Sequence, residues 1–266
     1  MANDIDISVM IPTFRREQEL LNAVNSVLEI QQLNIEVLIS DDSPEGSAAP
    51  FIEKVKDERV HYEKRRHPTG GLPAVVRNDL AQSANGRVFY FLDDDDTVVS
   101  RTLVEMYEKL MLSSAGVAIG VIRPVGDPDS PVVIHEQERY AFTRTRIQTY
   151  ISKYQFYSRL LNNFPLLVCS AAMVKQDVFH RVGGFNVELP LWEDVDFYLR
   201  AARESGYLFV DRVLLNRKTG GDSLVQNAKD DTRIEESFRM MSSMYRQKYG
   251  TAEWALLKML NRLHLV

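Results

Sequence analysis

Short apolar runs and longer amphipathic segments alternate along the first half of the chain. The apolar runs are predicted as strands at 5–11, 35–39, 60–63, 88–92 and 117–122. The segments whose apolar positions recur every three or four residues are predicted as helices at 17–29, 72–83 and 100–112. This alternation is typical of βαβ units, and it predicts an α/β fold with a mostly parallel central sheet flanked by helices.

The pattern becomes less regular after the fifth predicted strand. Scattered Pro, Asp and Gly without a clear period predict an irregular insertion at 123–146. A further strand is expected at 168–174, followed by a short helix at 177–186 that ends at Gly183 and Gly184. The insertion therefore interrupts the α/β pattern without dividing the chain into two domains.

The rest of the chain is helical in character. Trp192, Glu193 and Asp194 come directly before one predicted helix, and a C-terminal helical extension is expected at 226–266. In the last helix, 252–264, a tryptophan and several leucines interleave with basic residues. Such a pattern suits a helix that contacts an anionic membrane surface or forms a homo-oligomer, and packing on its own domain is the open alternative.

Composition and charge narrow the functional classes. The chain has 266 residues, of which 45% are hydrophobic, so it can bury a substantial core. A formal net charge of −5 gives no global field that would recruit nucleic acid. Cys169 is the single cysteine and predicts a reducing compartment without disulfides. The first residues do not resemble a signal peptide, so we expect a cytoplasmic protein, with peripheral contact to a membrane as an option.

Four consecutive carboxylates form the most conspicuous local feature. Asp93, Asp94, Asp95 and Asp96, which we call the acidic tetrad, follow the apolar strand predicted at 88–92. Adjacent negative charges repel one another, so a partner must make the cluster tolerable. A solvated surface and the start of the next helix are ordinary explanations. A divalent cation with oxygen ligands is the functional one, because strand ends of this kind hold ligands in α/β folds.

One alternative is that an aspartate of the tetrad is the nucleophile of a phosphatase. Asp93, Asp95 and Thr97 match the DxDxT motif of haloacid-dehalogenase-type phosphatases literally. That family carries the motif near its N-terminus, with a second acidic pair later in the chain. Here the other strand followed by an acidic pair, at Asp41 and Asp42, comes earlier. The order of the motifs therefore disfavours a phosphatase.

Several motifs in a fixed order point to a different family. Within residues 5–225 they are ISVMIPTFRREQELLNAVNSVL, VLISDDSPEGS, RNDLAQSANGRVFYFLDDDD, FHRVGGFN and WEDVDFYLRAARESGY. Together they resemble the family 2 glycosyltransferases, which have the GT-A fold, a Rossmann-like fold that binds nucleotide-diphospho-sugars. The resemblance implies a GT-A domain at 1–225 followed by the helical extension.

The resemblance also implies residues that bind the nucleotide sugar. Asp41 corresponds to the acid that contacts the base, and a carboxylate can accept the imide N–H of uracil or thymine. Asp42 is expected to brace the same loop instead, and either Arg65 or Arg66 is a candidate for the phosphates. The complete set expected on the nucleotide side is Pro12, Thr13, Phe14, Asp41, Arg66, Arg77, Asp93 and Asp94. Arg77 and Asn78 have the open alternative of being simply the polar face of their helix.

A metal site is implied at the tetrad. Asp93 and Asp95 match the acids of the family's DXD motif, and they would hold Mn²⁺ or Mg²⁺ together with the diphosphate. Asp94 and Asp96 are left to contact sugar hydroxyls or to cap the next helix. Many family members complete the site with a His that is absent from the corresponding segment, 216–223. Arg217 or Lys218 in that segment is a candidate to neutralise the diphosphate instead.

The acceptor side has its own expected residues. Asp194 corresponds to the general base that removes the proton of the acceptor hydroxyl, with Glu193 and Asp196 as rivals. Helix-dipole stabilisation of these acids is the structural alternative. The residues expected to contact the acceptor are Gly184, Phe185, Trp192 and Glu193.

Taken together, the resemblance implies an inverting, metal-dependent glycosyltransferase of the hexosyltransferase type. A UDP-sugar is the favoured donor, and a lipid-linked or other glycan is the expected acceptor, as in polysaccharide biosynthesis. A noncatalytic protein that binds nucleotide sugars is the remaining alternative.

Overall fold

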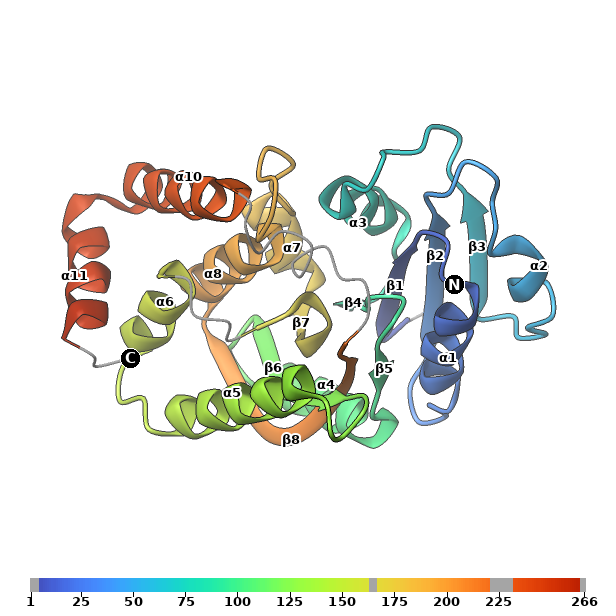
Figure 1. The fold of residues 1–266 in the computed structure, drawn as a ribbon, viewed down its shortest axis with the longest axis horizontal. Coiled ribbons are helices and arrows are strands. Elements are labelled where there is room, and N and C mark those ends of the chain that lie inside the picture. The colour runs from blue at the N-terminus through green and yellow to red at the C-terminus, as the bar shows by residue number, and fades with distance from the viewer. Residues whose placement is uncertain (1–4, 163–166, 221–231, 264–266) are drawn as a thin grey trace.

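The computed structural model describes residues 5–162, 167–220 and 232–263, which contain an eight-stranded sheet with helices around it (Figure 1). The strands are β1 (Ile7–Thr13), β2 (Ile35–Asp41), β3 (Val60–Lys64), β4 (Val88–Phe91), β5 (Thr97–Val98), β6 (Val117–Val125), β7 (Ala172–Lys175) and β8 (Tyr207–Lys218). The helices are α1 (Glu17–Leu28), α2 (Ala49–Ile52), α3 (Pro73–Ser83), α4 (Ser100–Leu112), α5 (Pro131–Gln148), α6 (Lys153–Leu161), the 3₁₀ turn η1 (Cys169–Ala171), α7 (Gln176–Val182), α8 (Glu193–Ser205), α10 (Thr232–Tyr249) and α11 (Thr251–Arg262).

The sheet has the strand order β3-β2-β1-β4-β7-β6-β8-β5 and is mixed. The four strands from β3 to β4 are parallel, whereas β7 runs antiparallel to both of its neighbours and β5 runs antiparallel to β8. The α/β prediction is confirmed, with fewer parallel pairings than the sequence pattern suggested. Because β1, β2 and β4 are parallel neighbours, the segments that follow them meet at one edge of the sheet.

Strand β1 continues through Pro12, which the sequence pattern takes as its end. Pro12 is in register with Ser40 of β2, and one residue later the Thr13 carbonyl accepts a hydrogen bond from the Asp42 amide. The backbone of Pro12 therefore points towards β4, whose pairing with β1 stops at Met10. No ladder hydrogen bond is lost there, so proline is tolerated.

The segment predicted as an irregular insertion at 123–146 is regular. Its first residues extend β6 to Val125, and after a short turn the long helix α5 begins at Pro131. The inward face of α5 includes the polar Thr143, while Phe142 and Ile134 are exposed. Apolar residues on the outer face and a polar residue on the inner face hide the helical period in the sequence.

The C-terminal helices pack on the chain's own domain, at the opposite end of the molecule from β3 (Figure 1). Leu257 of α11 is fully buried, and its carbonyl accepts a hydrogen bond from Ser158 of α6. Lys258 donates to Asn162, so one of the basic residues expected to face a membrane is used internally. This supports the alternative of packing within the domain. None of the described helices is long and apolar enough to cross a membrane.

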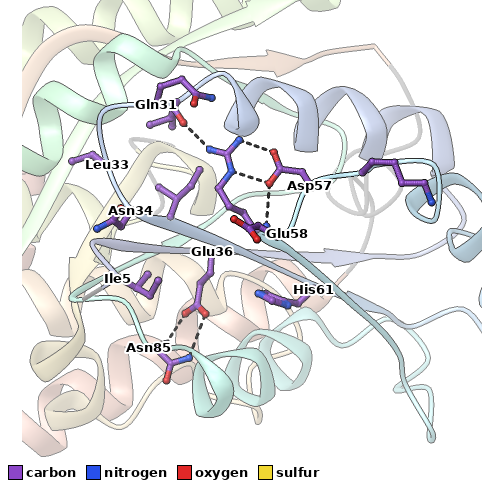
Figure 2. Close-up of a pocket in the computed structure, with 13 residues that line it drawn as sticks. Ile5, Gln31, Leu33, Asn34, Glu36, Asp57, Glu58, His61 and Asn85 are labelled. Carbon is purple, nitrogen blue, oxygen red and sulfur yellow. Dashed lines mark hydrogen bonds and ion pairs between the residues drawn. The ribbon is translucent and has the colours of Figure 1, made fainter. Parts of the chain in front are cut away.

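A cavity of about 1440 Å³ lies at the amino-terminal ends of β2 and β3, away from the acidic tetrad (Figure 2). Two of its charged residues, Glu36 and Arg59, are bound to partners within the chain. Glu36 accepts hydrogen bonds from Ser8 and Asn85, and Arg59 binds Asp57 and two carbonyls at the end of α1. These contacts join β2 to β1 and to the segment before β4, and they join the residue before β3 to the end of α1, so this part of the lining serves the fold.

Candidate active site at the carboxyl edge of the sheet

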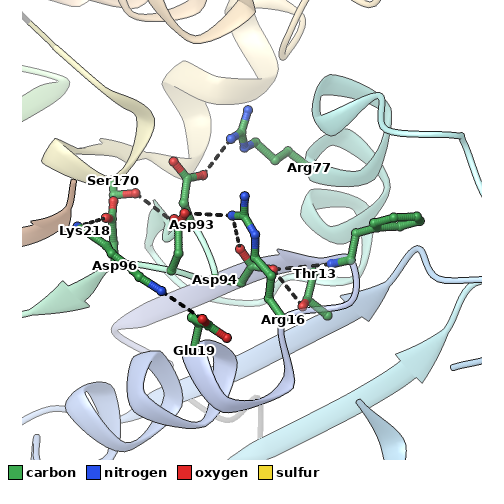
Figure 3. Close-up of polar contacts among 11 residues, drawn as sticks. Thr13, Arg16, Glu19, Arg77, Asp93, Asp94, Asp96, Ser170 and Lys218 are labelled. Atoms are coloured by element: carbon green, nitrogen blue, oxygen red, sulfur yellow. Dashed lines mark hydrogen bonds and ion pairs between the residues drawn. The ribbon is translucent and has the colours of Figure 1, made fainter. Parts of the chain in front are cut away.

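The acidic tetrad forms the turn between β4 and β5. Strand β4 and Leu92 are completely buried, so Asp93 is the first residue to leave the core. The Asp96 amide then donates to the Asp93 carbonyl at 3.2 Å, which closes a tight turn and keeps the four carboxylates together. Figure 3 shows arginine side chains from two other segments reaching this turn.

Arg16 is the first of these partners. Its Nη1 donates to Asp94 Oδ1 at 3.0 Å and to Asp95 Oδ2 at 2.7 Å. Asp94 also accepts hydrogen bonds from the Thr13 hydroxyl at 2.8 Å and from the Phe14 amide at 3.3 Å. The segment after β1 is thereby fixed to the tetrad, which leaves the Phe14 ring 42% exposed beside it.

Arg77 is the second partner, and it comes from α3. Its Nη2 donates to Asp93 at 2.7 Å and its Nη1 donates to Glu193 at 2.7 Å. Arg77 is only 5% exposed, so its guanidinium is shielded from water, although the Asp93 side chain is 32% exposed. This guanidinium joins the tetrad to the first turn of α8, where Asp194 also lies.

Burial keeps the carboxyl groups of Asp94, Asp95 and Asp96 from ionising easily. Burial raises the pKa of Asp94 to about 6, against the opposing effect of Arg16. Burial and the neighbouring charge of Asp93 raise the pKa of Asp95 and, more strongly, that of Asp96. The nearby guanidiniums offset only part of the cost of ionising these buried carboxyl groups, so a further cation would be stabilised at the site.

Asp194 has a pKa suited to proton transfer near neutrality. Burial raises the pKa of Asp194 to about 7, with a further contribution from the Glu193 carboxylate, while Arg77 acts in the opposite direction. Its own carboxylate accepts a hydrogen bond from the Val195 amide at 2.8 Å. The rivals have other partners, because Glu193 binds Arg77 and the buried Asp196 forms an ion pair with Arg200.

The start of α8 is strained. Trp192, which precedes the helix, has a φ of 66° in the left-handed region, where bulky residues are rare. Its indole packs on Phe238 of α10 at 5.2 Å between ring centroids. The Leu191 amide also donates to Ser237 of the same helix. Helix α10 thus holds the segment that presents Glu193 and Asp194.

The predicted acceptor loop is tied to α3. The side chain of Asn78 donates to the Phe185 carbonyl at 2.8 Å and accepts from the Phe185 amide at 2.9 Å. Gly184 has a φ of 69°, and a Cβ there would lie 2.6 Å from Asn78 Oδ1, so glycine is required. The Phe185 ring is buried against Phe91 and Phe197 and supports the loop from the core side.

The residues expected around the base are held by their own loop. Asp41 is fully buried and accepts hydrogen bonds from the Ser43 amide, the Ala48 amide and the Tyr62 hydroxyl. Asp42 accepts from Thr69 and forms an ion pair with Arg65 at 3.3 Å. Arg66 is exposed in the loop after β3. The contact of Asp41 with a base stays a prediction.

The segment expected to replace the family's histidine lies beside the tetrad. Arg217 binds Glu136 of α5 at 3.0 Å, and the Lys218 ammonium binds Glu19 of α1 at 2.8 Å. The backbone amide of Lys218 donates to Asp96 at 3.1 Å. Residues 221–223, the rest of that segment, lie outside the described residues.

The carboxylate oxygens of the tetrad are suitable ligands for Mg²⁺ or Mn²⁺. Asp93 and Asp95 each have one carboxylate oxygen bound to an arginine, and each is partly exposed. Within the described ranges, no three His, Cys, Asp or Glu side chains are grouped as a metal site. Two carboxylates that share a cation with substrate phosphates are nevertheless the usual arrangement for Mg²⁺.

Comparison with known proteins identifies the family. The family model described as Glycosyl transferase family 2 matches residues 8–183, more than half of the chain. The chain belongs to glycosyltransferase family 2. This decides against the phosphatase interpretation of Asp93 and Asp95, and the GT-A prediction agrees with the structural neighbours.

Two similar curated proteins act on undecaprenol-linked sugars, according to their names. The GalNAc(5)-diNAcBac-PP-undecaprenol beta-1,3-glucosyltransferase of Campylobacter jejuni is 29% identical over 39% of this chain and 34% of its own length. The UDP-Glc:alpha-D-GlcNAc-diphosphoundecaprenol beta-1,3-glucosyltransferase WfaP of Escherichia coli is 33% identical over 34% of this chain and 35% of its own. The matches thus span about a third of each relative.

Solved structures agree in fold. Residues 1–349 of S. aureus TarS in complex with UDP-GlcNAc superpose with a TM-score of 0.69 at 16% identity, covering 91% of this chain and 67% of that one. The corresponding complex with UDP gives a TM-score of 0.67 over 91% of this chain and 66% of that one, also at 16% identity. At this identity the likeness concerns the fold.

Arg16 and Ser170 are the site residues that the sequence patterns do not identify. Ser170 lies in η1, and its hydroxyl accepts a hydrogen bond from the Asp93 amide at 3.0 Å. Arg16 lies within the first of the quoted motifs, two residues after Phe14, so its position is a usable signal. Nothing in the local sequence around Ser170 links it to the tetrad, because the contact bridges 77 positions.

The raised pKa of Asp194 predicts a pH-dependent effect on stability. Its value of about 7 in the folded chain lies above the usual value of about 4. The stability that follows from this difference is complete below pH 4 and is lost as the pH rises through 7. We expect Asp194→Asn to match the wild type near pH 4 and to melt at a higher temperature at pH 8. Thermal unfolding at several pH values tests this, and a gap that does not change with pH would contradict it.

Proposed function

We propose that the chain is an inverting glycosyltransferase that moves a sugar from a UDP-sugar to a hydroxyl group of a glycan acceptor. The observation that carries the proposal is the link through Arg77, which places a cation-attracting turn next to a carboxyl group with a pKa of about 7. The acidic tetrad can hold a diphosphate with its metal, and the Asp194 carboxylate can accept a proton. A sugar transfer needs both groups within reach of one bond.

The donor would bind across the segments that follow β1, β2 and β4. The exposed ring of Phe14 offers a surface for the base, and Arg66 in the loop after β3 is available to the phosphates. Asp93 and Asp95 would hold Mg²⁺ or Mn²⁺ through their carboxylate oxygens. Such a cation, when bound, stabilises the negative charge of the departing diphosphate.

Asp194 would act as the general base. The acceptor oxygen attacks the anomeric carbon while its proton passes to the Asp194 carboxylate. The bond between the anomeric carbon and the diphosphate oxygen breaks, and its electron pair leaves with UDP. A single displacement of this kind inverts the configuration. Arg77 keeps Glu193 engaged and so leaves Asp194 as the acid that is able to take the proton.

The acceptor would enter next to Trp192 and the loop held by Asn78. Both named relatives carry undecaprenol diphosphate in their acceptor names, which supports a lipid-linked glycan here. An acceptor of this type would bring the chain to a membrane surface. The TarS complex with UDP-GlcNAc supports a UDP-sugar as the donor.

The role of Asp95 predicts metal-dependent binding of UDP. We expect Mn²⁺ to strengthen UDP binding, and Asp95→Asn to remove most of that increase. Without metal, the variant should melt at an equal or higher temperature, because a neutral amide relieves the repulsion within the tetrad. Titration calorimetry gives the affinities, with Asp177→Asn as a control at an exposed acid of α7. The same metal-enhanced affinity in Asp95→Asn would refute the assignment.

The role of Asp194 predicts a selective loss of turnover. We expect Asp194→Asn to retain UDP affinity and to lose roughly 10²–10⁴ in transfer rate, the usual contribution of a general base. Glu193→Gln should cost less and should move the acidic limb of the rate profile to lower pH, since the Glu193 charge raises the pKa of Asp194. Transfer from UDP-sugars to undecaprenol-diphosphate-linked sugars is the assay.

Two outcomes would contradict this assignment. If Asp194→Asn keeps near-wild-type turnover while Glu193→Gln or Asp196→Asn abolishes it with UDP binding intact, a different acid is the base. If the wild type binds UDP-sugars but transfers no sugar to any acceptor or water, the chain is a noncatalytic binding protein.

A further inference from the structure

We propose that Arg16 competes with the divalent cation for the acidic tetrad and thereby couples binding of the cation to binding of the donor's diphosphate. The inference rests on the proposed function in one respect, since it takes the diphosphate as the second ligand. The competition itself concerns only Arg16, Asp94 and Asp95.

The contacts of Arg16 place its charge where a cation would bind. Its Nη1 contacts one oxygen of Asp94 and one oxygen of Asp95, at 3.0 Å and 2.7 Å. Asp95 is a proposed metal ligand, so a divalent cation on its carboxylate would face the guanidinium at close range. Two positive charges at such a distance repel each other, and one has to withdraw.

The two arginines of the site differ in their freedom to withdraw. The Arg77 side chain is 6% exposed and bridges acids from two elements, so moving it would open the core. The Arg16 side chain is 33% exposed, and its partners are the buried Asp94 and the partly exposed Asp95, so it can turn towards solvent when another cation takes its place at these carboxylates. Arg16 is therefore the exchangeable counter-charge, and Arg77 is the fixed one.

The backbone before α1 directs the side chains of two consecutive arginines, Arg15 and Arg16, to different partners. Arg15 has a φ of 55°, in the left-handed region that is uncommon for residues other than glycine. Its guanidinium binds the exposed Glu45 through two hydrogen bonds of 2.6 and 3.1 Å. The turn sends Arg15 outwards and Arg16 to the tetrad. Arg15 consequently provides a control with the same charge, one residue away.

Competition at the tetrad predicts cooperativity. A cation that binds alone has to displace Arg16 from Asp95 without giving the guanidinium a new partner. A diphosphate bound at the same time offers Arg16 an anionic partner, because guanidinium and phosphate match in geometry. Each ligand should therefore strengthen the other by the same factor, as linkage requires.

The test is Mn²⁺ binding to the full chain, measured by electron paramagnetic resonance with and without UDP. We compare the wild type with Arg16→Gln, Arg16→Lys and Arg15→Gln. Without UDP, Arg16→Gln should bind Mn²⁺ roughly tenfold more tightly or better, because the competing charge is gone. Arg16→Lys keeps a charge and should stay near the wild type, and Arg15→Gln should match the wild type.

The second arm measures how much UDP strengthens Mn²⁺ binding. This factor should be smaller in Arg16→Gln than in the wild type and unchanged in Arg15→Gln. The proposal is wrong if Arg16→Gln binds Mn²⁺ no more tightly than the wild type. It is also wrong if Arg15→Gln gains as much Mn²⁺ affinity as Arg16→Gln, or if no variant binds Mn²⁺. If Mn²⁺ affinity rises in Arg16→Gln but no variant binds UDP, the competition stands and the proposed function fails.

Discussion

The candidate active site depends on one buried guanidinium. Arg77 lies between Asp93 and Glu193, at 2.7 Å from each, and it joins the end of β4 to the start of α8. Without its charge, the mostly buried Glu193 and the partly exposed Asp93 would lose their cationic partner, which costs more than an exposed ion pair contributes. The position of α3, which carries Arg77 and Asn78, therefore fixes the geometry of both sides of the site.

The site holds more carboxyl groups than the arginine side chains around it can neutralise. Burial raises the pKa of Asp94 to about 6 and that of Asp194 to about 7, so both groups titrate near neutral pH. Such an arrangement disfavours the folded state, and it is usual where binding or catalysis requires a particular charge. The strained backbone at Arg15 and Trp192, next to the site on either side, fits the same interpretation.

The sequence pattern predicted the parts of the fold that depend on regular alternation. Strands that end in acids were placed correctly because buried strands are apolar throughout and parallel strands share one edge. Helix α5 was missed, since its inward face includes Thr143 while Phe142 points outwards. The partners of the tetrad could not be predicted from spacing, because Arg16 lies 78 positions from Asp94 and only the fold brings them together.

The most direct test of the account is the unfolding free energy of an Arg77 series in urea. Arg77→Met alone should lose about 3–5 kcal/mol, the usual cost of removing one partner from a buried ion pair. Adding Asp93→Asn and Glu193→Gln to Arg77→Met should recover much of that loss, because the stranded charges are then gone. The contrary result is a triple variant that is less stable than Arg77→Met by the sum of the losses measured for Asp93→Asn alone and Glu193→Gln alone. In that case Arg77 does not hold the site together through these two acids.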